Sequence, residues 1–254
     1  MGVGTFGEYE LVFDERLYGR WQRRFLNFVR WGRVRTSGLA RIPENGPALL
    51  TPNHLSWKDV PFIGSVISRP ISFIATYRLF DARICLSMLY EHYALFVRDP
   101  FFRRLFRRPI HAISASVARI MVDRVTRLGA IPARLHAKDY SLIDAVKDAF
   151  RKGRLVLMFP EGRSGEPGKL DRFKPGVPRI LLEYFQETGE TVPVYPVGVQ
   201  GTHRFYRPGM KLGLHVGNPI DIRNFIRDTE NKTLNAFNEA LKDRVFFLLQ
   251  NESG

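Results

Sequence analysis

The chain has a single cysteine, Cys85, among its 254 residues, and no apolar run of about 18 residues or more. One cysteine excludes an intramolecular disulfide and a cysteine-based metal cluster, which fits a reducing compartment. Without a long apolar run, no conventional membrane-spanning helix is expected. The segment from Met1 to Arg16 lacks the basic and apolar regions of a signal peptide, and Phe6 stands where myristoylation requires Ser or Thr. We therefore expect a protein that stays in the cytosol.

The chain also lacks internal repeats, low-complexity tracts and Pro/Gly/Ser-rich linkers. Its length suits one large α/β domain with a substantial core, so we predict a helical extension over residues 1–38 and a single domain over 39–254. Apolar patterning predicts alternating strands and helices, which favours a mixed, largely parallel sheet flanked by helices. The predicted strands are 48–51, 71–76, 155–159 and 212–216, and the predicted helices are 141–151, 178–187 and 233–249.

The segment Asn53–Asp59 combines a histidine, His54, with a carboxylate five residues later, Asp59. Residues five apart on one regular helix point about 140° away from each other, so the pair cannot meet there. The Ser56 and Asp59 spacing resembles a capping box, which predicts a turn over 52–55 and a helix from about Trp57. His54 and Asp59 could then face each other as a general base and its partner. Alternatively, Asp59 only caps the helix and His54 is an ordinary loop residue.

A second segment supports the catalytic interpretation. The predicted strand 155–159 is followed by Glu161 and Arg163. These residues would lie at its C-terminal end, where open α/β sheets place their ligand sites. An arginine in such a loop can hold a phosphate. The two segments together suggest a base that deprotonates the hydroxyl group of a phosphorylated acceptor.

These motifs resemble those of the glycerophosphate and lysophospholipid acyltransferase family, over roughly Arg41 to Ile220. Two departures stand out: Ala133 replaces an acidic residue of the second motif, and a residue is missing between Gly162 and Arg163 in the third. The first motif corresponds to Asn53, His54, Ser56 and Asp59, the second to Gly129–Arg134, the third to Phe159–Ser164 with Phe173–Gly176, and the fourth to Val192–Val197.

The resemblance implies acyl transfer by direct attack, with His54 as the base, Asp59 as its partner and no enzyme nucleophile. The donor would be acyl-CoA or acyl carrier protein, and no cofactor is implied. The acceptor would be a lysophospholipid, foremost lysophosphatidate, with another lyso-lipid or glycerol-3-phosphate as alternatives. Glu161 would position the acceptor or form an ion pair with Arg163. Arg134 and Lys174 would bind the phosphate of the acceptor or are merely solvated. The expected substrate-binding residues are Glu161, Gly162, Arg163, Ser164, Arg134 and Lys174.

The formal net charge is +14, and part of it follows two amphipathic patterns. The segment from Leu17 to Val29 places aromatic residues on one helical face and arginines around much of the remainder, as interfacial membrane helices do. The segment 101–108 repeats two apolar residues and two arginines, and Pro109 would end or kink such a helix. Both stripes could instead pack on the core. The predicted membrane contacts are Trp21, Phe25, Phe101, Phe102, Arg103, Arg104, Phe106, Arg107 and Arg108.

Together with the lipid-modifying motifs, these patterns favour a peripheral protein on the cytoplasmic side of an anionic membrane. A nucleic-acid-binding protein would share the basic pI of about 10.3, but it would explain neither motif, so we expect no nucleic-acid partner. An inactive membrane scaffold would have no use for His54 and Asp59. No metal site is predicted, because the remaining histidines lack partners at ligand spacing.

Overall fold

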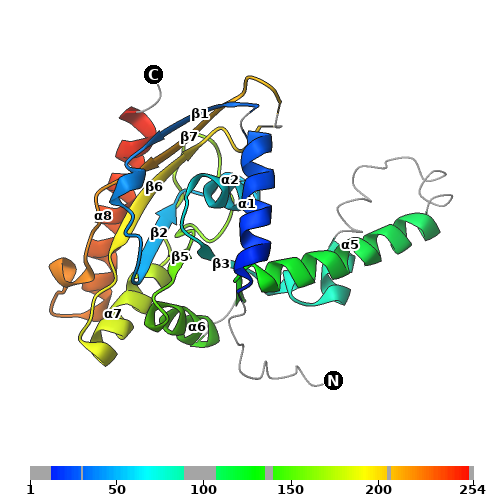
Figure 1. Cartoon of the computed structure of the whole chain (residues 1–254). Coiled ribbons are helices and arrows are strands. Elements are labelled where there is room, and N and C mark those ends of the chain that lie inside the picture. Colours follow the sequence, from blue (N-terminus) through cyan, green and yellow to red (C-terminus); the bar gives the residue numbers. More distant parts are fainter. Residues whose placement is uncertain (1–12, 30, 89–106, 135–139, 205–206, 252–254) are drawn as a thin grey trace.

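In the computed structural model, residues 13–29, 31–88, 107–134, 140–204 and 207–251 are described, and they form a seven-stranded sheet flanked by helices (Figure 1). The sheet order is β1-β7-β6-β2-β5-β3-β4. The strands are β1 (Arg33–Ser37), β2 (Ala48–Pro52), β3 (Ile71–Thr76), β4 (Ile131–Ala133), β5 (Leu155–Leu157), β6 (Val194–Gln200) and β7 (Lys211–Val216). The helices are α1 (Glu15–Val29), α2 (Asp59–Val66), α5 (Arg107–Arg127), α6 (Tyr140–Arg151), α7 (Gly176–Thr188) and α8 (Glu230–Asn251), with short 3₁₀ turns η1 (Leu39–Arg41), η2 (Tyr77–Leu79) and η3 (Ile222–Phe225).

The sheet is mixed and largely parallel, as the alternation of strands and helices predicted. Strand β2 pairs in parallel with both β5 and β6, and β3 pairs in parallel with both β5 and β4. Among the pairings of the seven described strands, the β6–β7 pairing alone is antiparallel, and β1 runs parallel to β7 at the edge. All five residues of β2 are buried, which explains why this central strand reads as a continuous apolar run rather than an alternating one.

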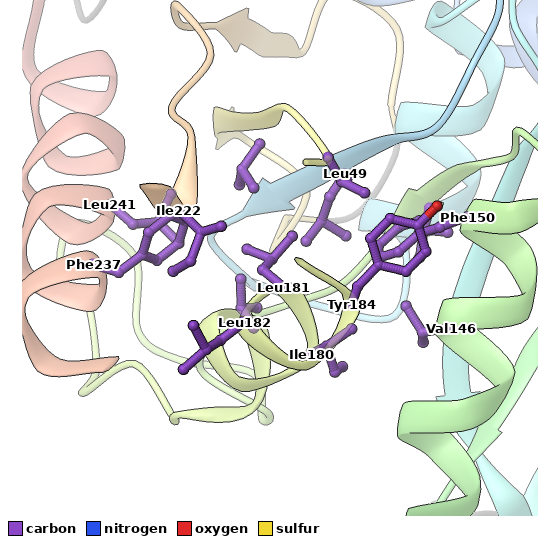
Figure 2. Packing of buried hydrophobic residues seen from close by; sticks show 14 of the residues in the cluster. Leu49, Val146, Phe150, Ile180, Leu181, Leu182, Tyr184, Ile222, Phe237 and Leu241 are labelled. Carbon is purple, nitrogen blue, oxygen red and sulfur yellow. The ribbon is translucent and has the colours of Figure 1, made fainter. Parts of the chain in front are cut away.

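Helices cover both faces of the sheet, so two cores form (Figure 1). Successive strand residues point to opposite faces, and accordingly Leu49 of β2 packs into one core while Leu50 packs into the other. The first core lies under α6, α7 and α8, where Phe150, Leu181 and Phe237 meet Leu49 (Figure 2). The second lies under α1 and α2. This double cover fixes β2, whose C-terminal end carries the first sequence motif.

Helix α1 is part of this cover. Asp14 begins it by accepting a hydrogen bond on Oδ1 from the Leu17 backbone N–H at 2.8 Å, as an N-cap residue does. A β-carbon on Gly64 of α2 would lie 2.8 Å from the Trp21 ring, so only glycine lets the two helices approach this closely. The strand that follows α1, β1, pairs with β7 although it precedes the expected boundary at residues 38 and 39. That boundary stays a prediction.

Three details differ from the sequence-based expectations. Helix α2 begins at Asp59 rather than near Trp57, because residues 57 and 58 form a turn, and β5 ends at Leu157 rather than at residue 159. Pro109 does not end a helix: it lies in the first turn of α5, where its missing N–H has no intrahelical partner to lose. Of the predicted membrane contacts, Phe101, Phe102, Arg103, Arg104 and Phe106 lie outside the described residues, whereas Arg107 and Arg108 begin α5.

No helix within the described ranges is long and apolar enough to cross a membrane.

Candidate active site

The turn after β2 brings His54 and Asp59 together. The distance from His54 Nδ1 to Asp59 Oδ2 is 2.7 Å. The Asp59 side chain is fully buried, whereas the His54 side chain is 18% exposed. As a carboxylate, Asp59 can only accept hydrogen bonds, so Nδ1 carries the proton and Nε2 keeps its lone pair. The pair therefore keeps its carboxylate inside and leaves the imidazole partly open to solvent.

Asp59 also organises the turn itself. Its Oδ2 accepts hydrogen bonds from the backbone N–H groups of Leu55 at 2.7 Å and Ser56 at 2.9 Å. Ser56 Oγ accepts one from the Lys58 N–H at 3.2 Å, whereas the Asp59 N–H donates to the Ser56 carbonyl, so only the Asp59 half of a capping box is present. The first turn of α2 is also a favourable place for negative charge because helix N-termini are partially positive. The N-cap position of α2 is Lys58, without a side-chain cap hydrogen bond, so Asp59 holds the imidazole and the preceding turn rather than the helix N-terminus.

The loop after β5 supports His54 from the other side. The Phe159 ring stacks on the imidazole with centroids 4.0 Å apart. Glu161 Oε1 accepts a hydrogen bond from the His54 backbone N–H at 2.9 Å, and the Gly165 N–H donates to the His54 carbonyl at 2.8 Å. The imidazole and its backbone are therefore fixed by the two motifs that the sequence separates by about a hundred residues.

Strand β6 anchors the start of the turn. Asn53 is buried, and its amide donates to the Val199 carbonyl at 3.0 Å while accepting from the Val199 N–H at 2.7 Å. Ser56 Oγ donates to the Thr202 carbonyl at 2.9 Å. These bonds tie the His54 turn to the segment that contains and follows β6, which limits how far His54 can shift.

The arginine of the third motif points outward beside this turn. The Arg163 side chain is 73% exposed, and its Nε donates to Asp171 Oδ2 at 2.9 Å. Its ion-pair partner is thus Asp171 and not Glu161, whose Oε2 instead accepts from the Asp171 backbone N–H at 2.9 Å. Gly162 has φ of +68°, and a β-carbon there would lie 2.8 Å from Lys174 Nζ. Lys174 therefore lies against the same loop that carries Arg163.

Comparison with known proteins identifies the fold and family of this arrangement. Residues 33–200 match the model of the Acyltransferase family, a span that contains the whole His54 turn and the Arg163 loop. The chain belongs to the acyltransferase family. This confirms the resemblance carried by the four motifs.

Among solved structures, this acyltransferase is similar to the crystal structure of the 1-acyl-sn-glycerophosphate (LPA) acyltransferase PlsC from Thermotoga maritima. The TM-score is 0.56 at 17% sequence identity, and the match covers 94% of this chain and 80% of that chain. At this identity the likeness establishes the fold alone. No curated protein sequence matches the chain significantly.

The predicted substrate-binding residues lie at different distances from the His54 turn. Glu161, Gly162, Arg163 and Lys174 share one loop region with the His54 turn, and Ser164 is exposed on the same loop. Arg134 follows β4 at the edge of the sheet, and β3 separates that strand from β5. Within the described residues, no group of three or more His, Cys, Asp or Glu side chains could hold a metal ion.

Sequence reasoning missed the segment 202–204, whose backbone accepts hydrogen bonds from the His54 turn. Besides the Thr202 bond to Ser56, the Arg204 carbonyl accepts from Lys58 Nζ. Burial lowers the pKa of His203, and the charges of Arg204 and Lys58 lower it further, so this imidazole is neutral at physiological pH. Residues 202–204 carry no recognised motif, so the sequence gives no signal that they contact Ser56 and Lys58. Asp171, the partner of Arg163, was missed for the same reason.

Proposed function

We propose that this acyltransferase moves a fatty acyl group from an acyl thioester to the free hydroxyl of a lysophospholipid, foremost lysophosphatidate. The observation that carries the proposal is the 2.7 Å contact between His54 Nδ1 and Asp59 Oδ2 at the end of the central strand. A buried carboxylate that fixes the tautomer of a partly exposed imidazole is the arrangement of a general base. The family match supports acyl transfer as the reaction.

In the proposed mechanism, His54 Nε2 accepts the proton of the acceptor hydroxyl while Nδ1–H stays bonded to Asp59. The hydroxyl oxygen attacks the thioester carbonyl, an ester C–O bond forms, and the C–S bond breaks. The imidazolium returns its proton to the departing sulfur, which leaves as a thiol. Asp59 stabilises the imidazolium throughout and remains ionised. Neither an acyl-enzyme intermediate nor an enzyme nucleophile is needed.

Arg163 is the proposed ligand for the acceptor phosphate. Because Asp171 accepts from Nε at 2.9 Å, the guanidinium plane is oriented and its two terminal nitrogens are left for a phosphate. A planar fork of this kind suits bidentate phosphate binding better than an ammonium group does. Lys174, on the same loop, would add positive charge. Arg134, on the far edge of the sheet, is the weaker candidate for this role.

The donor is proposed to be acyl-CoA or acyl carrier protein, and the acceptor could equally be another lyso-lipid or glycerol-3-phosphate. We further propose that the protein works at the cytoplasmic surface of an anionic membrane. The net charge of +14 supports this, as does the basic amphipathic helix α1. Trp21 and Phe25 of that helix are half-buried, so their exposed edges, rather than whole rings, would meet lipid.

The test is a thiol-release assay with palmitoyl-CoA and lysophosphatidate in mixed micelles, with the product identified as phosphatidate. We expect turnover by the wild type and a loss of about 10²–10⁴-fold in His54→Ala, at unchanged circular dichroism and Tm. A carrier-protein donor and other lyso-lipids are tested in parallel, so that a wrong substrate is distinguished from a wrong reaction. Wild-type protein that consumes none of these thioesters but binds DNA or RNA in a strongly salt-dependent way would overturn the proposal.

A further inference from the structure

A surface groove of about 320 Å³ lies between α1 and the C-terminal part of α5. Helix α5 extends away from the sheet, and its C-terminal end lies beside the N-terminal end of α1 (Figure 1). The groove has an unusually simple composition, with three arginines and three apolar side chains. Its lining residues are Leu17, Arg20, Trp21, Arg24, Phe25 and Arg124.

Five of these residues form one stripe along α1. Positions 17, 20, 21, 24 and 25 follow helical spacing of three and four, so they share one face. Arg124 comes from α5, about a hundred residues later. The Arg127 guanidinium bonds to Asp14 Oδ2 at 2.5 Å, which joins the last turn of α5 to the start of α1. The site thus exists only in the folded chain.

The groove is positively charged. The nearby carboxylates are already engaged: Asp14 accepts from Arg127 and from the Leu17 N–H. Asp123 lies 3.6 Å from Arg127 Nη1 and 3.9 Å from Arg124 Nε. Arg20 and Arg24 are exposed, and Arg124 is 53% exposed. Among the described residues, two acids against four arginines leave a net positive cluster that attracts an anion.

The apolar part of the groove is aromatic and rigid. The Trp21 and Phe25 rings stack with centroids 6.1 Å apart, and Tyr18 packs on Trp21 at 5.4 Å. The far edge of Trp21 is held against Gly64 of α2. Because the Trp21 and Phe25 rings are half-buried, they offer an apolar floor without being free to rearrange. A fully solvated anion such as inorganic phosphate would make no use of that floor.

We propose that this groove is a binding site for one anionic phospholipid of the membrane. Its phosphate would lie among Arg20, Arg24 and Arg124, and the adjoining part of its acyl chain along Trp21 and Phe25. A volume near the lower end of ligand pockets, which span about 300–1,000 Å³, suits a headgroup and a few methylenes rather than a whole lipid. The remainder of the lipid stays in the bilayer. Membrane docking through this site refines the proposed peripheral association.

The site differs from the proposed acceptor site, because its residues lie outside the His54 turn and the Arg163 loop. Binding is therefore measured without turnover, in a His54→Ala background. Trp31 and Trp57 are exposed, so replacing both with Phe leaves Trp21 as the only tryptophan. Its fluorescence is recorded with phosphatidylcholine vesicles that contain or lack phosphatidylglycerol with dibrominated acyl chains. Bromine quenches tryptophan only at close range.

We expect quenching of Trp21 by the brominated anionic lipid and little by phosphatidylcholine vesicles. Replacing Arg20, Arg24 and Arg124 with Gln should weaken vesicle binding on the order of 100-fold, given three cations near the headgroups. In the control, Arg33, Arg35 and Arg227 are replaced by Gln, which removes the same charge from exposed positions elsewhere. This control should weaken vesicle binding by about tenfold or less.

Equal losses in the two triple variants, or no quenching of Trp21, would overturn the proposed site. Saturable protection of Trp21 by inorganic phosphate alone would show a free-anion site instead of a lipid site. Displacement of the lipid by short RNA with the same arginine dependence would reassign the groove to nucleic acid. None of these outcomes depends on thiol release, so the acyl-transfer proposal stands or fails separately.

Discussion

Glu161 holds the backbone of His54 in place: Oε1 accepts its N–H at 2.9 Å, and Oε2 accepts the N–H of Asp171 at 2.9 Å. The Glu161 side chain is 2% exposed. Because both oxygens already accept from backbone N–H groups, we expect Glu161 to support the proposed base rather than to bind the acceptor. The same carboxylate also links the base to the residue that orients Arg163.

Glu161→Gln should therefore lower kcat more than it changes the KM for the acceptor. Glutamine keeps one acceptor oxygen but turns an NH₂ group toward a backbone N–H, which leaves a buried donor unsatisfied at a cost of about 1–3 kcal/mol. We expect kcat to fall roughly tenfold or more and Tm to fall with it. Glu166→Gln is the matched control, since this exposed residue of the same loop pairs only with Lys169 among the described contacts. A raised KM at unchanged kcat would instead make Glu161 an acceptor ligand.

Asp59→Asn should remove catalysis while leaving the turn folded. The amide oxygen can still accept from the N–H groups of Leu55 and Ser56, which Asp59 Oδ2 binds at 2.7 and 2.9 Å. It carries no charge to stabilise an imidazolium, although the same oxygen could still accept from His54 Nδ1. The expected loss in kcat is on the order of 10²–10⁴, measured by thiol release alongside thermal unfolding. A variant within tenfold of wild-type turnover would show that Asp59 serves only to hold the turn.

Arg163→Ala should raise the KM for lysophosphatidate, since it removes the proposed phosphate ligand and leaves His54 in place. A charge-assisted hydrogen bond is worth about 1.5–3 kcal/mol, which corresponds to a rise of roughly 10- to 100-fold. Arg172→Ala, an exposed neighbour, is the control for charge alone. The effect should disappear with monoacylglycerol as acceptor, because that molecule has no phosphate. Equal effects on both acceptors would remove Arg163 from phosphate binding.

Asp14→Asn should destabilise the protein near neutral pH and lose this effect in acid. The hydrogen bond from the Leu17 N–H, and then the Arg127 guanidinium, lower the pKa of Asp14. Ionised Asp14 therefore stabilises the folded state above the unfolded pKa of about 3.9, and this contribution is lost as the pH falls through the folded value. Asparagine keeps the capping oxygen, so the variant isolates the charge. Thermal unfolding of the variant and the wild type at pH 7 and pH 3 checks this prediction. An equal difference in Tm between the two proteins at both pH values would contradict it.

Local patterns in the sequence predicted most elements of the fold. The apolar run of β5 and the alternating faces of α6 and α8 appear where periodicity placed them, because each element buries its own face. The same holds for His54 and Asp59, whose spacing excludes a shared helix and whose flanking Ser56 marks the turn.

What the sequence did not predict depends on contacts between distant segments. No local pattern states that β2 lies between β5 and β6, that Asp171 receives Arg163, or that Arg124 joins a stripe on α1. The topology of the whole chain decides which strands pair and which surface charges meet. In the sequence, an arginine that binds a ligand looks the same as one that is only solvated. The structure places Arg20 and Arg24 of α1 beside Arg124 in one groove, while the membrane contact of α1 stays a prediction.

The position of β2 also has a consequence for how the protein is made. This central strand, residues 48–52, is buried only when β5 and β6 pair with it, and both are synthesised about a hundred residues or more later. Until then, its apolar residues remain exposed on the nascent chain, a situation that invites aggregation. The His54 turn is tied to Val199 and Thr202, so a chain released before these residues are made would lack the contacts that hold His54, even with His54 and Asp59 already present.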